Sequence, residues 1–229
     1  MDQVAPEGLI DSGPLLGSRV SGGQGLLEFS EGPRSEKRMR GRDRFEAETR
    51  FLRSWFERPL VTGAIAPSGR LLAQTMASYV DPRRTGPVVE LGPGTGPVTD
   101  ALLRQGIEQE RLVLVEYNPE FCQLLKRRFP RATIVQGDAY EAGDVLADVV
   151  KEPCAGILSS LPLLTKPLDQ RLSLLAAAHA MLHRYAPFVQ FTYGVKPPIP
   201  ARSSSYTATS SERIWLNFPP ARVWVYRQG

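Results

Sequence analysis

An apolar strand that runs into a glycine-rich turn is the feature that most constrains this chain. Residues 88–96 read Val-Val-Glu-Leu-Gly-Pro-Gly-Thr-Gly. Glycines let the backbone turn sharply and approach a ligand where a side chain would collide. The spacing G-x-G-x-G, with Glu90 on the strand before it, differs from the G-x-G-x-x-G of pyrophosphate-binding loops. It suits a ligand with an ammonium group and no phosphate, and Glu90 is expected to face that cation.

Two further acids follow the next predicted strands. Glu116 closes the apolar run that begins at Leu112, and Gly137-Asp138-Ala139 follows the run Thr133–Gln136. Ligands of open α/β sheets bind where the carboxyl ends of the strands meet. An acid at Glu116 can accept both hydroxyls of a ribose, and Asp138 can accept a bond from an adenine amino group. The three loops together predict S-adenosylmethionine as cofactor, bound by Glu90, Gly92, Gly94, Thr95, Gly96, Thr99, Glu116, Tyr117, Asp138, Ala139 and Ser159.

The order of predicted elements gives the fold class. Apolar strands alternate with helical patterns, which indicates an α/β fold with a mostly parallel, doubly wound sheet. The last two strands, separated by a loop, are expected to form an antiparallel edge. The predicted strands are Val88–Leu91, Leu112–Val115, Thr133–Gln136, Ile157–Ser159, Phe188–Tyr193 and Arg222–Tyr226, and the predicted helices are Gly69–Tyr79, Val98–Gln105, Glu120–Phe129 and Asp169–Leu182.

The charge of the chain is concentrated before this domain. Residues 34–58 hold nine Lys/Arg and five Asp/Glu, and this excess of four equals the net charge of the whole chain, +4. The same stretch has an aromatic face that includes Phe51 and Trp55, flanked by arginines such as Arg40 and Arg44. Such a composition is typical of a helix lying in a membrane interface, although a solvated tail has it too. We therefore predict a disordered leader (1–33), a basic amphipathic arm (34–58) that binds anionic lipid, and a catalytic domain (59–229).

Other simple functions find little support in the composition. Cys122 and Cys154 form no C-x-x-C pattern, so we expect no disulfide. His179 and His183 are spaced like metal ligands but lack a third partner, so we expect no metal. No apolar run reaches the roughly 18 residues of a membrane span, and no secretory signal is expected. The prediction is a cytoplasmic protein that associates peripherally with the inner leaflet, and nothing in the sequence specifies an oligomeric state.

Several segments resemble a known family. Residues 90–96, Glu116 and Gly137-Asp138 look like the first three motifs of the class I, Rossmann-like methyltransferases. Residues 57–68, residues 159–164 and the ending at 213–226 resemble the bacterial phospholipid N-methyltransferases, which are similar to the ribosomal RNA adenine dimethylases. The resemblance implies stepwise methylation of phosphatidylethanolamine towards phosphatidylcholine at the membrane surface.

The fourth motif separates these two families. Adenine dimethylases carry Asn-Leu-Pro-aromatic there, which bonds and stacks a flipped base. This chain has Ser160-Leu161-Pro162-Leu163, without the amide and the ring. The substitution argues against a nucleic-acid substrate. The alternatives kept open are an RNA adenine methylase, an ornithine-lipid N-methyltransferase and a non-catalytic cofactor-binding module.

Aromatic and hydroxyl side chains are the candidates for the acceptor site. Aromatic rings can contact a methylated nitrogen through cation–π interactions, and hydroxyl oxygens can accept bonds from an amine. The expected catalytic residues are Tyr206, Tyr193 and Ser160, with Trp215 further off. The expected substrate and membrane residues are Arg40, Arg44, Phe51, Trp55, Pro67, Ser68 and Tyr140, with Pro67 and Ser68 in a lid over the site.

Overall fold

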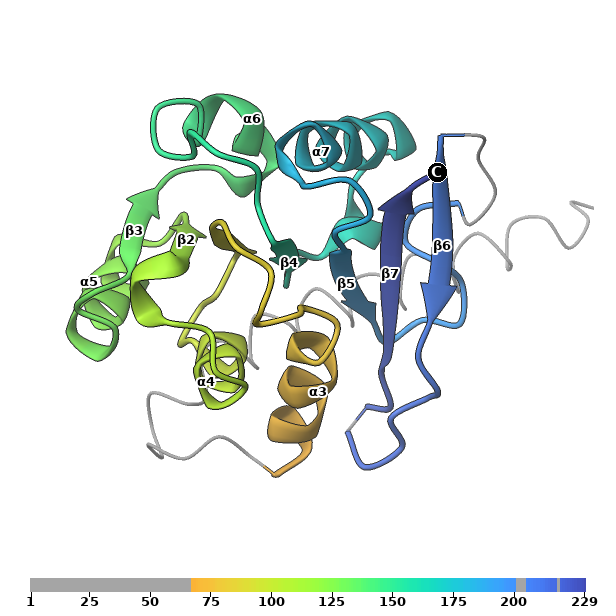
Figure 1. The fold of residues 1–229 in the computed structure, drawn as a ribbon. Helices are drawn as coiled ribbons and strands as arrows, with labels where there is room; N and C mark the ends of the chain where they lie inside the picture. Colours follow the sequence, from red (N-terminus) through yellow and green to blue (C-terminus); the bar gives the residue numbers. More distant parts are fainter. Residues whose placement is uncertain (1–66, 201–204, 218) are drawn as a thin grey trace, which may run out of the picture.

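The computed structural model describes residues 67–200, 205–217 and 219–229, and the predicted leader and arm (1–58) lie outside this part. Seven strands form one sheet with helices on both faces (Figure 1). The strands are β1 (Val88–Leu91), β2 (Leu112–Glu116), β3 (Thr133–Gln136), β4 (Gly156–Ser159), β5 (Phe188–Thr192), β6 (Tyr206–Ser210) and β7 (Arg222–Gln228). The α-helices are α3 (Pro67–Ala77), α4 (Pro97–Arg104), α5 (Pro119–Arg128), α6 (Ala142–Val145) and α7 (Leu168–Met181), and the 3₁₀ turns are η1 (Gln109–Arg111), η2 (Ala139–Glu141) and η3 (Leu163–Thr165).

The sheet has the strand order β3-β2-β1-β4-β5-β7-β6. Strands β1 to β5 pair in parallel, and β7 pairs antiparallel with both β5 and β6. The α/β class and the mostly parallel sheet are therefore confirmed, including the antiparallel pairing of the strands at 188 and 222. Strand β6 was not predicted from the sequence; it lies outside β7 and forms the rim of the sheet.

Alternating side chains divide the core into two layers. On β1, Val88 joins one apolar cluster, whereas Val89 and Leu91 join the other. The first cluster packs under α3, α4 and α5, and the second under α6 and α7 (Figure 1). All residues of β1, β2, β4 and β5 are buried, as expected for parallel strands covered on both faces. Helices on both faces of the sheet therefore hold in place the strand ends that carry the candidate site.

Local chemistry sets where α4 and α5 begin. Asn118 caps α5, because its side chain accepts hydrogen bonds from the backbone N–H groups of Glu120 (2.8 Å) and Phe121 (3.3 Å). Pro119 follows at the first helical position, where a missing N–H costs nothing. Pro97 opens α4 in the same way, after Gly96 in the left-handed conformation. Both helices therefore start one residue before the predicted boundary.

Candidate active site

Three loops converge at the carboxyl edge of the parallel strands. The N–H of Gly92 donates to the carbonyl of Val115 (2.9 Å), and the N–H of Ser160 donates to that of Leu91 (2.9 Å). The N–H of Gly137 donates to the carbonyl of Glu116 (3.1 Å). These bonds continue the ladders β1–β2, β1–β4 and β2–β3 beyond the strands. The predicted loops therefore lie side by side at one edge.

The glycine loop adopts a backbone that other residues rarely adopt. Gly92, Gly94 and Gly96 have φ values of +71°, +57° and +84°. A Cβ atom on Gly96 would lie 2.6 Å from Cε2 of Phe129, so this position also lacks room for a side chain. Thr95, between the last two glycines, is buried. The loop thus presents backbone rather than side chains to the crevice.

Glu90 is fully buried beside this loop. Its Oε2 accepts a hydrogen bond from the Thr99 hydroxyl (2.6 Å), while Oε1 has no hydrogen-bond partner among the described residues. Burial raises the pKa of Glu90 to about 8, although the bond from Thr99 works in the opposite direction. A buried carboxylate oxygen without a donor is costly unless a ligand supplies one. An ammonium group would satisfy it.

Glu116 ties the end of β2 to the glycine loop. Its Oε2 accepts from the N–H of Gly94 (3.0 Å), and its Oε1 accepts from the N–H of Asn118 (2.8 Å). An ionised carboxylate has about four acceptor positions, so each oxygen can still accept a ligand hydroxyl. The next residue, Tyr117, is mostly exposed at this edge. Glu116 therefore fits the predicted contact with a ribose.

Asp138 follows β3 and begins the turn η2. Its side chain accepts from the N–H of Tyr140 (2.9 Å) and is otherwise exposed. Ala139 beside it is buried. The carboxylate is held in place and keeps free acceptor positions, which suits an adenine amino group. The unpartnered Glu90 oxygen, the bound Glu116 carboxylate and the glycine backbone together fit S-adenosylmethionine.

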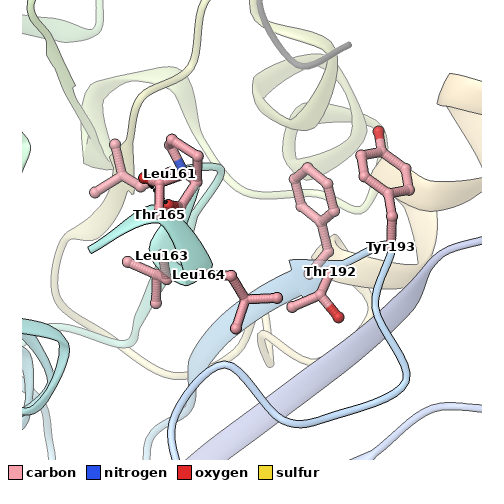
Figure 2. Close-up of a pocket in the computed structure, with 8 residues that line it drawn as sticks. Leu161, Leu163, Leu164, Thr165, Thr192 and Tyr193 are labelled. Carbon is pink, nitrogen blue, oxygen red and sulfur yellow. Dashed lines mark hydrogen bonds between the residues drawn. The ribbon is translucent and has the colours of Figure 1, made fainter. Parts of the chain in front are cut away.

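A mostly apolar pocket lies beyond the ends of β4 and β5 (Figure 2). It lies between the η3 turn and the end of β5, and none of the residues that line it in the described part of the chain is charged. Ser159 and Ser160, just before this turn, are both buried, and the Ser159 hydroxyl accepts from the N–H of Leu161 (3.4 Å). The lining residues are Leu161, Pro162, Leu163, Leu164, Thr165, Phe191, Thr192 and Tyr193.

Gln190 connects two parts of the pocket wall, and it was not predicted as a site residue. Its Nε2 donates to the carbonyls of Leu161 (3.0 Å) and Phe191 (2.8 Å), so it joins the pocket turn to β5. Its Oε1 is buried without a hydrogen-bond partner among the described residues. A glutamine in the middle of the apolar strand Phe188–Thr192 was the available signal, since a buried amide there needs partners.

The aromatic candidates occupy different places. Tyr193 lines the pocket, with its ring edge-on to Phe191 at 5.4 Å between centroids. Tyr140 lies nearby, but the Lys166 ammonium already stands 4.4 Å from its ring centroid. This contact makes the predicted cation–π role of that ring face unavailable. Trp215 lies on the exposed β6–β7 turn.

Tyr206 does not fit the predicted catalytic role. Its backbone pairs with Gln228, whereas the site edge of β5 is marked by the pair Thr192–Arg222. Tyr206 therefore lies at the amino edge of the sheet, opposite the pocket. Its hydroxyl donates to the carbonyl of Pro200 (2.7 Å), and its ring packs against Tyr226. These contacts are those of a core residue.

The remaining predicted residues lie at the border of the described part or outside it. Pro67 and Ser68 form the start of α3, and only their backbone is described. The arm residues Arg40, Arg44, Phe51 and Trp55 lie outside the described residues. Within residues 67–200, 205–217 and 219–229, no three His, Cys, Asp or Glu side chains gather as a metal site. No helix in that part has the length and apolarity to cross a bilayer.

Parts of this chain are similar in sequence to known methyltransferases. Residues 69–167 match the family of ribosomal RNA adenine dimethylases. An ornithine lipid N-methyltransferase from Singulisphaera acidiphila is 28% identical over 145 residues, which cover 62% of this chain and 76% of that protein. The ribosomal RNA small subunit methyltransferase A of Synechococcus sp. strain JA-2-3B'a(2-13) is 38% identical over 92 residues, 39% of this chain. The match spans only 30% of the length of the Synechococcus protein.

Solved structures support the fold. An O-methyltransferase from Bacillus cereus, solved with S-adenosylhomocysteine, superposes with a TM-score of 0.55 at 12% identity. The superposition covers 81% of this chain and 90% of that one. The chain therefore has the class I methyltransferase fold.

Proposed function

We propose that this chain, a class I S-adenosylmethionine-dependent methyltransferase related to the ribosomal RNA adenine dimethylases, methylates the primary amine of a membrane lipid headgroup. The observation that carries the proposal is the apolar pocket after β4. At the position where adenine dimethylases hold and stack a base, it offers Leu161, Pro162 and Leu163. An aliphatic amine needs neither a stacking ring nor a base-pairing amide.

At the carboxyl edge of the sheet, one group of residues binds the methyl donor and another positions the acceptor amine. Glu90, Glu116 and Asp138 bind and orient the donor, and the glycine loop lets its backbone approach the crevice. S-adenosylmethionine supplies an electrophilic methyl group on a sulfonium, which an amine lone pair attacks in line. Since the leaving group is good, holding the amine in line contributes most of the acceleration. The turn at 161–164 supplies that positioning.

The amine must lose its proton before it can attack. The described lining of the pocket has no charged side chain, and an apolar surrounding lowers the pKa of an ammonium group. Ser160 accepts a hydrogen bond from the amine, and Tyr193 presents its ring to the nitrogen as methyl groups accumulate. Among the described residues, no Asp, Glu or His lines the pocket, and the proton leaves to water.

Two headgroups fit this chemistry. Phosphatidylethanolamine is the acceptor that the sequence resemblance implies. The similarity to an ornithine lipid N-methyltransferase favours ornithine lipid as a second candidate. Both headgroups join a primary amine to an anionic group. The basic arm at 34–58 brings the enzyme to anionic lipid, and the reaction takes place at the cytoplasmic face of the membrane.

The test is methyl transfer with labelled S-adenosylmethionine. The full chain is incubated with vesicles of phosphatidylethanolamine, vesicles of ornithine lipid, or ribosomal RNA, and products are separated by thin-layer chromatography or nuclease digestion. We expect label in lipid in at least one vesicle sample and none in RNA adenine, with no product from Glu116→Ala. Label in adenine alone would overturn the proposal. A variant lacking residues 1–56 should lose binding to anionic vesicles in sedimentation if the arm acts as proposed.

A further inference from the structure

The turn between β6 and β7 presents two large apolar side chains to solvent. Trp215 is 73% exposed and the adjacent Leu216 is 79% exposed. Large apolar side chains usually contribute to a core. An adjacent tryptophan and leucine that are exposed at the end of a hairpin therefore indicate a surface that contacts a partner.

Hydrogen bonds hold this turn in shape. Ile214 and Ala221 form a bridge in which each N–H donates to the other carbonyl, at 2.7 and 3.3 Å. Asn217 is buried, and its Nδ2 donates to the carbonyl of Pro219 (2.7 Å). The bridge and the asparagine bond fix the backbone of the turn that carries the two exposed side chains. The hydrogen-bonded turn therefore holds both side chains in exposed positions.

The turn lies on the same side of the sheet as the pocket. Strand β6 runs from Tyr206, at the amino edge, to Ser210, and the hairpin then returns to Arg222, which pairs with Thr192 at the carboxyl end of β5. The guanidinium of Arg213 donates to the carbonyl of Tyr193 (3.2 Å). One hydrogen bond therefore links the hairpin to a residue that lines the pocket.

Cationic groups accompany the apolar tip. The Arg213 guanidinium carbon lies 5.4 Å from the Trp215 ring centroid, and Arg222 lies at the base of the hairpin. On the neighbouring loop, Val195 and Lys196 are both exposed. Glu212 is the one acidic residue in 193–200 and 205–222. Tryptophan at the level of the headgroups, with cations beside it, is the arrangement that binds an anionic membrane interface.

We propose that Trp215 and Leu216 insert into the headgroup region of an anionic bilayer, and so hold the pocket mouth against the membrane surface. This inference rests on the proposed function, because it gives the lipid its route into the pocket. The apolar tip enters the bilayer while the exposed Lys196 meets lipid phosphates. The lipid amine then reaches the pocket without leaving the bilayer.

Depth-dependent fluorescence quenching tests the insertion directly. The full chain contains three tryptophans, Trp55, Trp215 and Trp224. In the variant Trp55→Phe/Trp224→Phe, only Trp215 emits. Vesicles of phosphatidylglycerol and brominated phosphatidylcholine should quench that emission, and bromines near the headgroup should quench more than bromines at the chain ends. Unquenched emission from vesicle-bound protein would overturn the insertion.

A second variant avoids any change to the core. Trp215→Ser/Leu216→Ser should weaken flotation with anionic vesicles by about tenfold or more, since an interface contact of this size is removed. The matched control is Tyr185→Asn, which changes another exposed aromatic, in the turn before β5 at the opposite edge of the sheet. Equal flotation of both variants and the unmodified protein would refute the inference. So would self-association in the absence of vesicles that the double variant abolishes.

Activity separates this inference from the proposed function. The double variant should methylate vesicle-embedded phosphatidylethanolamine about tenfold more slowly, and a short-chain form below its micelle concentration at the unchanged rate. Quenching of Trp215 without any lipid methylation would leave the membrane contact and refute the proposed function. Lipid methylation without quenching would refute the membrane contact alone.

Discussion

Replacing Glu90 by glutamine tests the donor site most directly. The carboxyl is fully buried, and Thr99 bonds only one of its oxygens. With a pKa of about 8, the unliganded protein holds Glu90 mostly protonated at neutral pH. The ionised fraction is about 1% at pH 6, about 10% at pH 7 and about half at pH 8. The ammonium of S-adenosylmethionine requires the ionised form.

The affinity for the cofactor should therefore depend on pH. In the unmodified protein, affinity should rise nearly tenfold between pH 6 and 7 and level off near pH 8, where the amino group of the cofactor begins to lose its own proton. Glu90→Gln should be flat from pH 6 to 7. At pH 8 it should bind about 10- to 100-fold more weakly, since a hydrogen bond to a charged group is worth about 1.5–3 kcal/mol.

Calorimetry in buffers of different ionisation enthalpy measures this linkage. At pH 7 the unmodified protein should release close to one proton for each cofactor bound, and the variant almost none. Binding without proton release, or the same pH slope in both proteins, would refute the reasoning.

Thermal unfolding without cofactor provides the control for Glu90. The folded-state pKa lies above the unfolded value, so the folded protein holds the proton between about pH 4.5 and 8. Its stability should therefore fall as pH rises through this window. The glutamine variant should lack this loss and unfold at a higher temperature at pH 8.

The other predictions concern the pocket and the sheet. Gln190→Leu should lower kcat about tenfold with little change in KM for the cofactor, because the pocket turn loses its tether; an unchanged kcat would contradict the positioning role. Gly96→Ala should destabilise the fold by about 2–4 kcal/mol in denaturant unfolding, because the new methyl group meets Phe129. Gly106→Ala, also at positive φ but in open space, should cost only about 1 kcal/mol; equal losses would refute the steric argument. Tyr206→Phe should keep full activity and lose about 1 kcal/mol of stability, whereas a large loss of activity would restore its predicted catalytic role.

The donor half of the site could be predicted because its signals are local. Glu90 and Glu116 lie on strands and Asp138 lies two residues after β3, and parallel strands bring such positions to one edge. The predicted strands β1 and β3 have the observed bounds, and every other predicted boundary lies within two residues of the observed one. An apolar run followed by a glycine or an acid suffices for this level of detail.

The acceptor half depends on long-range placement, which local patterns do not contain. Strand β6 is rich in Thr, Ser and Ala and largely exposed, so no apolar alternation marks it. Tyr206 lies at its first residue, and only the direction of the strand decides at which edge of the sheet the ring is placed. Lys166 covers Tyr140 for a similar reason, because the two residues are far apart in the chain and meet only in the fold.

The strand order decides which parts of the chain form the two halves of the site. The chain adds β2 and β3 on one side of β1, and then adds β4 and β5 on the other side. The donor contacts therefore come from the β1–β3 flank of the sheet, and the pocket comes from the β4–β5 flank. The match to the adenine dimethylases covers residues 69–167 and ends where α7 begins. Everything after that point, including β5, β6 and β7, lies on the pocket flank. The pocket is therefore built from both sides of this boundary: its turn, residues 161–165, lies inside the matched segment, and Phe191, Thr192 and Tyr193 follow it.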